Sequence, residues 1–234
     1  ASLERLDTDY IDLFWLHAWD FTTPIDEIMR GLDDLVSMGT INYVAISDTP
    51  AWLVSQANTI ADFRGWAPFV GLQIEYSLIQ RTPERDLLPM AKALDIAVTP
   101  WAPLAGGALT GKYLKDDGSD KRLKAESQRL NDRNRGIAQA VVDIAAELGV
   151  SPAQVAIRWT MQKDQVMIPI VGARKLSQIQ DSLKATEFEI PAEHMARLDE
   201  VSSIELGFPH DFLRSDGVKT VVSGGTYDEI DRHR

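Results

Sequence analysis

Short apolar runs alternate with helical patterns along this chain, and the first run sets the plan for the others. Tyr10-Ile-Asp-Leu-Phe-Trp-Leu-His17 consists mostly of large apolar residues and ends on a histidine. Such a run predicts a parallel β-strand that is buried on both faces. A loop over residues 18–23 follows, and Pro24 then opens a helical pattern. The chain repeats this order of strand, polar tip, loop and helix, which predicts five βα units.

The same alternation gives the expected limits of the other elements. Strands that alternate with helices imply an α/β fold, a parallel sheet with helices outside it. We expect one domain over residues 1–234, a flexible polar loop over 113–135 and an irregular C-terminal extension over 207–234. The expected strands are 10–17, 41–46, 69–74, 96–100 and 166–171, and the expected helices are 25–36, 52–63, 84–94, 136–148, 153–162, 177–185 and 191–201.

Composition and charge narrow the class of protein. The 234 residues are 44% hydrophobic and 25% charged, as in ordinary globular domains. The net charge of −11 disfavours binding to nucleic acid or to an anionic membrane surface. The absence of cysteine excludes disulfides, thiolate nucleophiles and cysteine metal sites, and we expect no metal site. No apolar run has the length of a membrane span, and we expect a cytoplasmic protein.

Polar residues at the strand ends are the first candidates for function, because ligands bind at the carboxyl ends of parallel strands. His17 ends the first strand and is suited to share a proton with a substrate oxygen. Ser47, Asp48 and Gln73 end the next two strands and offer the donors and acceptors that a carboxamide needs. The structural alternatives are a histidine that caps a loop and side chains that cap their own loops.

Two further segments offer ligand chemistry. Trp101 directly follows the fourth strand, where its ring is suited to stack on a flat heterocycle, although a core aromatic is the alternative. The glycine-rich segment 104–112 ends in Lys112, a combination that suits a pyrophosphate, but it lacks the order of residues of a Walker A loop. Gly172-Ala-Arg174 precedes a predicted helix and offers a second anion site, with a solvated arginine as the alternative.

Taken together, these residues resemble the aldo-keto reductase family. Asp9-Tyr-Ile-Asp-Leu-Phe-Trp-Leu-His17 is similar to that family's fourth barrel strand with its catalytic histidine. Ser47-Asp48 and Gln73 resemble the residues that hold the nicotinamide carboxamide, where the family has Ser-Asn and Gln. The segment from Trp101 to Tyr113 resembles the stacking aromatic residue and the pyrophosphate belt. The segment 172–182 resembles the adenosine-binding segment, where many members have Glu-Asn in place of Asp181-Ser182.

The resemblance implies a (β/α)₈ TIM barrel of which about five units are present, so we expect an N-terminally truncated, partial barrel. It places the family's catalytic Asp, Tyr and Lys on strands that this sequence lacks, which leaves His17 as the one catalytic residue carried over. It implies NADP(H) as the cofactor, with NAD as the alternative. The cofactor-binding residues that it implies are Ser47, Asp48, Gln73, Trp101, Pro103, Leu104, Gly106, Leu109, Gly111, Lys112, Gly172, Arg174, Gln178, Asp181 and Ser182.

The resemblance therefore predicts an oxidoreductase that reduces small carbonyl compounds to alcohols. Without the Asp, Tyr and Lys, we expect weak or absent activity for the 234-residue chain, because losing a general acid costs roughly 10²–10⁴ in rate. The alternative is a non-catalytic nucleotide-binding or scaffold protein with a reductase-like shell. A third interpretation is that the sequence is part of a longer enzyme. Exposed strand edges also predict self-association.

Overall fold

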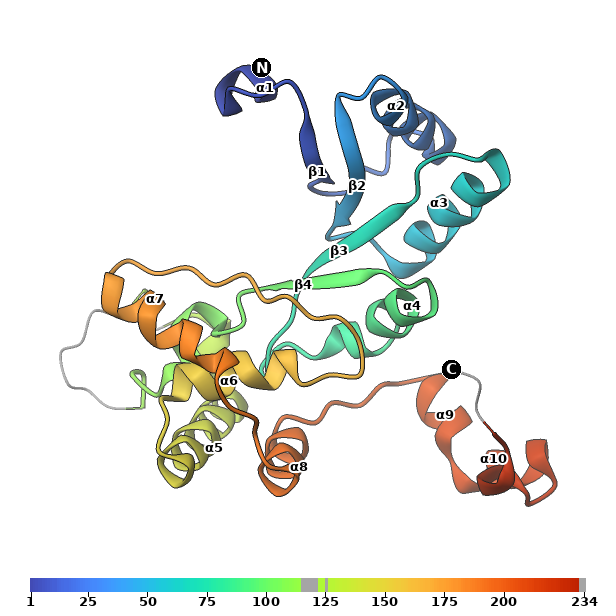
Figure 1. Ribbon diagram of the computed structural model, residues 1–234. Helices are drawn as coiled ribbons and strands as arrows, with labels where there is room; N and C mark the ends of the chain where they lie inside the picture. The colour runs from blue at the N-terminus through green and yellow to red at the C-terminus, as the bar shows by residue number, and fades with distance from the viewer. Residues whose placement is uncertain (115–121, 125, 232–234) are drawn as a thin grey trace.

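The computed structural model describes residues 1–114, 122–124 and 126–231. Four parallel strands form one sheet, in which their spatial order is their order in the chain. Each of the first three strands is followed by a helix, and Figure 1 shows these helices together on one side of the sheet. The strands are β1 (Ile11–Leu16), β2 (Ile41–Ser47), β3 (Phe69–Glu75) and β4 (Ala97–Trp101), and the helices are α2 (Ile25–Ser37), α3 (Ala51–Arg64) and α4 (Leu87–Ala93).

The second half of the described chain is helical. Helices α5, α6 and α8 lie together beyond β4, whereas α9 and α10 lie apart from them near the C-terminus (Figure 1). The α-helices not yet given are α1 (Ser2–Leu6), α5 (Asp132–Leu148), α6 (Pro152–Met161), α7 (Leu176–Leu183), α8 (Ala192–Val201), α9 (His210–Arg214) and α10 (Asp216–Ser223). The 3₁₀ helices are η1 (Thr82–Glu84), η2 (Ala105–Thr110), η3 (Gln128–Leu130), η4 (Lys184–Thr186) and η5 (Tyr227–Glu229).

The two faces of the sheet have different environments. Leu16, Ile46, Leu72 and Val98 form one cross-strand row in register. Ile46, Leu72 and Val98 have no exposed surface, because this face packs against the helices. The neighbouring residues along each strand point to the opposite face, where Tyr43 is 60% exposed. The helices therefore cover one face of this sheet. The other face is exposed at Leu13 and Tyr43, whereas Ala45 and Ser47 on it are buried.

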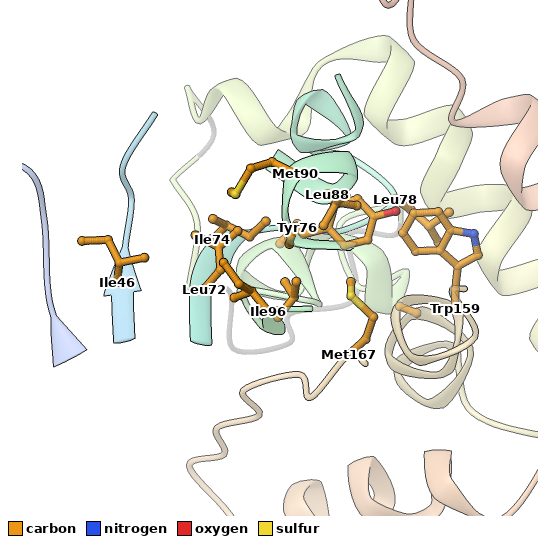
Figure 2. Packing of buried hydrophobic residues seen from close by; sticks show 14 of the residues in the cluster. Ile46, Leu72, Ile74, Tyr76, Leu78, Leu88, Met90, Ile96, Trp159 and Met167 are labelled. Carbon is orange, nitrogen blue, oxygen red and sulfur yellow. The ribbon is translucent and has the colours of Figure 1, made fainter. Parts of the chain in front are cut away.

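The core extends beyond the sheet through Tyr76, which follows β3. Its ring stacks on Trp159 of α6 with 5.3 Å between the ring centroids, and Figure 2 shows the two side chains next to each other. The Tyr76 hydroxyl donates a 2.6 Å hydrogen bond to Glu84. Burial, followed by the Glu84 carboxylate, raises the pKa of Tyr76 far above its usual range, so the hydroxyl stays protonated and keeps this bond.

Arg81 connects this aromatic pair to α8. Its guanidinium donates to both carboxylate oxygens of Glu84, at 2.8 and 2.9 Å, and to the backbone oxygen of Asp199 at 2.9 Å. The indole Nε1 of Trp159 donates to the Asp199 carboxylate at 3.0 Å. This network is partly buried, since the Arg81 side chain is 11% exposed and that of Asp199 is 41% exposed. Each charge in it has an opposite charge as a partner, which is the condition under which ionic groups are tolerated in a core.

Four expectations from the sequence differ from the structure. The first strand was expected to be buried on both faces, but β1 lies at the edge of the sheet and contains no buried residue. The predicted strand over 166–171 is an isolated bridge between Met167 and Val98, although three backbone hydrogen bonds join this segment to β4. Helix α5 begins at Asp132, within the predicted loop, because the Asn131 side chain caps it by accepting from the backbone N–H of Asn134. Residues 115–121 and 125 of that loop lie outside the described residues. The C-terminal extension, expected to be irregular, contains α9 and α10.

In the described part of the chain, no single helix is long and apolar enough to cross a membrane. The pair α5 and α6 passes that test only when taken together, with a 99° bend between them.

Candidate functional site

The predicted tip residues lie at the carboxyl ends of the strands, on the face of the sheet opposite the helices. Ser47 pairs in register with Gln73, and Gln73 pairs with Thr99. His17 follows directly after Leu16, which pairs with Ile46, so His17 extends this row beside Ser47. The structure therefore brings His17, Ser47 and Gln73 to one end of the sheet, and it adds Thr99, which the sequence reasoning missed.

Ser47 has an unusual environment for a polar side chain. It is 1% exposed, and its hydroxyl is one of two buried side-chain groups with an unpartnered N or O atom among the described residues. A buried hydroxyl without a partner costs free energy, and such groups in proteins usually have a ligand or functional reason. A carboxamide at the sheet end would supply the missing partner once the side chains that cover this hydroxyl move aside.

Asp48 lies beside Trp101 at the sheet end. The indole Nε1 of Trp101 donates a 3.1 Å hydrogen bond to Asp48 Oδ1. Asp48 has a φ of 44°, and its backbone N–H donates to the carbonyl of Gln73 at 3.1 Å. Hydrogen bonds to the Gln73 backbone and to the Trp101 side chain thus hold Asp48 in place. The second of these bonds also orients the Trp101 ring.

A cavity of about 1110 Å³ begins at Trp101 and runs along the segment after β4 to the start of α7. This volume is slightly above the range typical of small-molecule sites. Ten of the residues that the resemblance implies for cofactor binding line it: Trp101, Pro103, Leu104, Gly106, Lys112, Gly172, Arg174, Gln178, Asp181 and Ser182.

The glycine-rich segment forms the near wall of the cavity. Gly106 has a φ of +70°, and a Cβ atom there would lie 2.9 Å from Leu123 Cδ2. Gly111 has a φ of +79°, and a Cβ atom there would lie 2.5 Å from Val142 Cγ2. Only glycine fits both the left-handed backbone and the close neighbour at these two positions. The chain can therefore turn tightly beside the cavity with its backbone accessible.

The cavity is cationic although the whole chain is strongly acidic. Its lining contains five Lys or Arg residues and a single carboxylate, that of Asp181, whereas the full sequence has a net charge of −11. A local excess of positive charge in a concave site attracts anions such as phosphates. The five cations are Lys112, Arg122, Arg129, Arg174 and Lys175.

Asp181 is engaged by the protein itself. Its carboxylate accepts hydrogen bonds from the Ser151 hydroxyl at 2.6 Å and from Gln154 Nε2 at 2.5 Å. Ser151 also caps α6, because its hydroxyl accepts from the backbone N–H of Gln154. Asp181 therefore ties α7 to the start of α6. At the same end, Gln178 accepts a 3.0 Å bond from the backbone N–H of Arg174, which holds the segment before α7.

Not every predicted residue lines the cavity. Leu109 is fully buried and packs in the hydrophobic core. Gly111 lies outside the wall and supports the turn, while His17, Ser47, Asp48 and Gln73 lie at the sheet end beyond Trp101. Three cations of the cavity were not predicted from the sequence: Arg122, Arg129 and Lys175. The sequence analysis considered cations only at strand tips and in glycine-rich segments. The basic run Arg174-Lys175 was a signal that could have found Lys175.

The fold and the site together define an α/β protein with a cationic cavity at the carboxyl end of a parallel strand. The model of the aldo/keto reductase family matches residues 1–203, and the chain belongs to this family. The resemblance seen in the sequence is confirmed at that level, as is the parallel α/β architecture.

Curated relatives are enzymes by name. The chain is 37% identical over 227 residues to aryl-alcohol dehydrogenase [NADP(+)] of Phanerodontia chrysosporium, which covers 92% of this chain and 58% of that protein. It is 33% identical to a probable aryl-alcohol dehydrogenase of Saccharomyces cerevisiae, over 94% of this chain and 68% of that protein. It is also 33% identical to norsolorinic acid reductase of Aspergillus flavus, over 91% of this chain and 54% of that protein. The chain thus spans little more than half of the first and third of these relatives.

Proposed function

We propose that this chain binds NADP(H), with the nicotinamide end at the tips of β2, β3 and β4 and the phosphates in the cavity. The observation that carries the proposal is the concentration of five cations around a glycine-lined cavity that begins at Trp101. The unpartnered hydroxyl of Ser47 lies at the same end of the sheet, and a carboxamide would satisfy it once the side chains that cover it move aside. The relative from Phanerodontia chrysosporium is named for NADP(+), which favours this cofactor over NAD.

The reaction that fits this site is the reduction of a carbonyl compound to an alcohol, or its reverse. The nicotinamide cofactor, when bound, supplies or accepts a hydride. The chain's own residues would orient that cofactor: Gln73 and Ser47 through hydrogen bonds and Trp101 through its ring. His17 is exposed at the same end of the sheet and is the side chain placed to donate a hydrogen bond or a proton to a substrate oxygen.

The substrate class we propose is aromatic aldehydes and ketones. Two relatives are named as aryl-alcohol dehydrogenases, one of them as probable, and a third as a reductase of norsolorinic acid. The loop directly after His17 also contains Phe21, whose ring is 70% exposed and is suited to contact an aromatic ligand.

We also propose that the 234-residue chain alone turns over slowly. Of the ionisable groups at the carboxyl ends of the described strands, Asp48 accepts from Trp101, and Glu75 is paired with Arg129. The Tyr76 hydroxyl is buried and donates to Glu84. His17 is thus the remaining group for proton transfer at this end. This arrangement favours a second candidate function, a nucleotide-binding protein without catalysis.

Titration with NADPH and NADH, followed by a turnover assay with an aromatic aldehyde, tests the proposal. We expect NADPH to bind more tightly than NADH and turnover to be slow but measurable. Gln73→Ala and Trp101→Ala should weaken nucleotide binding in either case. Loss of turnover with those changes supports the enzyme, whereas binding without any turnover in the wild-type chain supports the non-catalytic alternative. Absence of binding to either nucleotide would overturn both.

The face of the sheet opposite the helices supports a proposal about the architecture. We propose that the four strands are part of a (β/α) barrel, since they are parallel, ordered and covered by helices on one face only. In the isolated chain, β1 is an edge strand and the face opposite the helices exposes Leu13 and Tyr43, which pair in register. We propose that two copies associate through this edge, because identical strand edges are complementary to each other. Light scattering that gives a monomer at all concentrations would contradict the association.

A further inference from the structure

An ion pair joins the tip of β3 to the 3₁₀ helix η3, which lies 54 residues further along the chain. Arg129 Nη2 donates to Glu75 Oε1, and the side chains are only 31% and 24% exposed, respectively. Glu75 lies two residues after Gln73 and therefore on the same face of the sheet. It also pairs in register with Trp101, so the ion pair lies beside the aromatic residue that begins the cavity.

The other side of Arg129 faces the cavity. Arg129 is one of the lining residues, and a Cβ atom at Gly106 would lie 3.4 Å from its Nη1 atom. The guanidinium therefore lies against the glycine-rich turn, between the strand tip and the cavity. Within the described residues, Nη1 has no hydrogen-bond partner.

A guanidinium held in this way is well suited to bind phosphate. Arginine presents its N–H donors in a rigid planar fork, so an ion pair on one edge fixes the direction of the donors on the other. Fixing the side chain before the ligand arrives reduces the conformational entropy that binding would otherwise cost. The contact with Gly106 places this fork next to accessible backbone, which is a common setting for phosphate oxygens.

We propose that Arg129 binds a phosphate group of the nucleotide and that Glu75 is its positioning residue. The inference rests on the proposed function, since it assigns a ligand contact in the same cavity. It adds to that function a cation from outside the strand tips and the glycine-rich segment. Glu75 in this role does not touch the ligand and acts only through the orientation of Arg129.

The test is a comparison of dissociation constants for NADPH and for inorganic pyrophosphate in wild type and variants. Arg129→Gln is expected to weaken both ligands by roughly 10-fold. Arg129→Lys keeps the charge but loses the fork, and we expect an intermediate loss. Glu75→Gln should weaken both ligands by a smaller factor, roughly 3-fold. Arg30→Gln, a matched change at an exposed position on α2, is the control and should change neither.

A double-mutant comparison separates positioning from general damage to the fold. If Glu75 acts through Arg129, Glu75→Gln should have no further effect on binding once Arg129 is Gln. The steepness with which pyrophosphate affinity falls with salt should also decrease in Arg129→Gln, since one cation contact is lost. Thermal unfolding of each variant checks that it is folded at the temperature of the assay.

The possible outcomes distinguish a failure of the proposed role of Arg129 from a failure of the proposed nucleotide binding. Wild type that binds neither NADPH nor pyrophosphate would overturn the proposed function and the inference with it. Wild type that binds, together with an Arg129→Gln variant that binds equally well, would overturn the inference alone. Equal effects of Glu75→Gln in the wild-type and Arg129→Gln backgrounds would overturn the positioning role of Glu75.

Discussion

The indole Nε1 of Trp101 donates a 3.1 Å hydrogen bond to the carboxylate of Asp48, and this bond joins the tips of β4 and β2 across the end of the sheet. Asp48 is itself fixed by a backbone hydrogen bond to Gln73 on the strand between them. Three tips are therefore connected before any ligand binds. The orientation of the Trp101 ring depends on a residue that is 53 positions earlier in the chain.

Removal of the Asp48 carboxylate should weaken nucleotide binding. Asp48→Ala deletes the acceptor that orients Trp101, and a net hydrogen bond contributes about 0.5–1.5 kcal/mol, so we expect roughly a 2- to 12-fold rise in Kd for NADPH. Asp48→Asn keeps an acceptor oxygen and should remain close to wild type. The Kd of each variant can be measured from the quenching of tryptophan fluorescence as NADPH is added. An unchanged Kd in Asp48→Ala would show that the bond does not orient the ring for binding.

Asp181 should contribute more to stability than its place in the cavity suggests. Asp181→Ala leaves the Ser151 hydroxyl and Gln154 Nε2 without their acceptor, so we expect the free energy of unfolding to fall by about 1–3 kcal/mol. Urea unfolding gives the difference. Asp62→Ala, at an exposed position on α3, is the matched control and should be nearly neutral. Equal midpoints for the two variants would contradict this role.

Loss of Arg81 should be the most destabilising of these changes. Arg81→Met removes the cation that pairs with Glu84, whereas Asp199 is 41% exposed and keeps its ion pair with Lys163. We therefore expect a loss of about 3 kcal/mol, the lower end of the cost of breaking a buried pair. Tyr76→Phe removes a single donor to Glu84 and should cost about 1 kcal/mol. Trp159, which stacks on Tyr76, reports both transitions by fluorescence. If the free energy of unfolding falls less in Arg81→Met than in Tyr76→Phe, Arg81 does not contribute more to stability than Tyr76 does.

Glu147 should make stability depend on pH in the acidic range. Hydrogen bonds from Arg197 and then from His194, which join the end of α5 to α8, lower the pKa of Glu147 from 4.5 to about 2. Because the folded pKa lies below the unfolded value, this stabilisation is present above pH 4.5 and is lost as the pH falls towards 2.

Glu147→Gln should therefore be less stable than wild type near neutral pH, and the difference should shrink below pH 4.5. Urea midpoints of both proteins at about pH 7 and about pH 3 measure this change. A difference that is the same at both values would mean that the carboxylate charge does not contribute.

The strand tips could be predicted from the sequence because a local pattern determines them. A parallel strand within a sheet favours an apolar run, so the residue at which the run stops, such as His17 or Ser47, marks the tip. The segment 166–171 has the same pattern but forms only a bridge. Its side chains Ile168 and Ile170 are exposed, at 56% and 44%, and β4 is its single partner among the described strands.

The cavity could be predicted only in part. The glycines and Lys112 form a pattern that can be recognised in the sequence. Arg129, in contrast, is held at the cavity by an ion pair with Glu75, and no local pattern encodes a contact over 54 residues. Asp181 gives the opposite case. The sequence resemblance implies an adenosine contact, whereas packing against α6 gives its carboxylate two partners within the protein.

The position of β1 at the margin of the sheet has a consequence for how the native state opens. β1 is bonded to β2 alone, whereas β2 and β3 each have strands on both sides. Local opening is cheapest where the fewest buried contacts must be broken. Amide protons of β1 should therefore exchange with deuterium when this strand alone frays. Amide protons of β2 and β3 should exchange only when the whole protein unfolds.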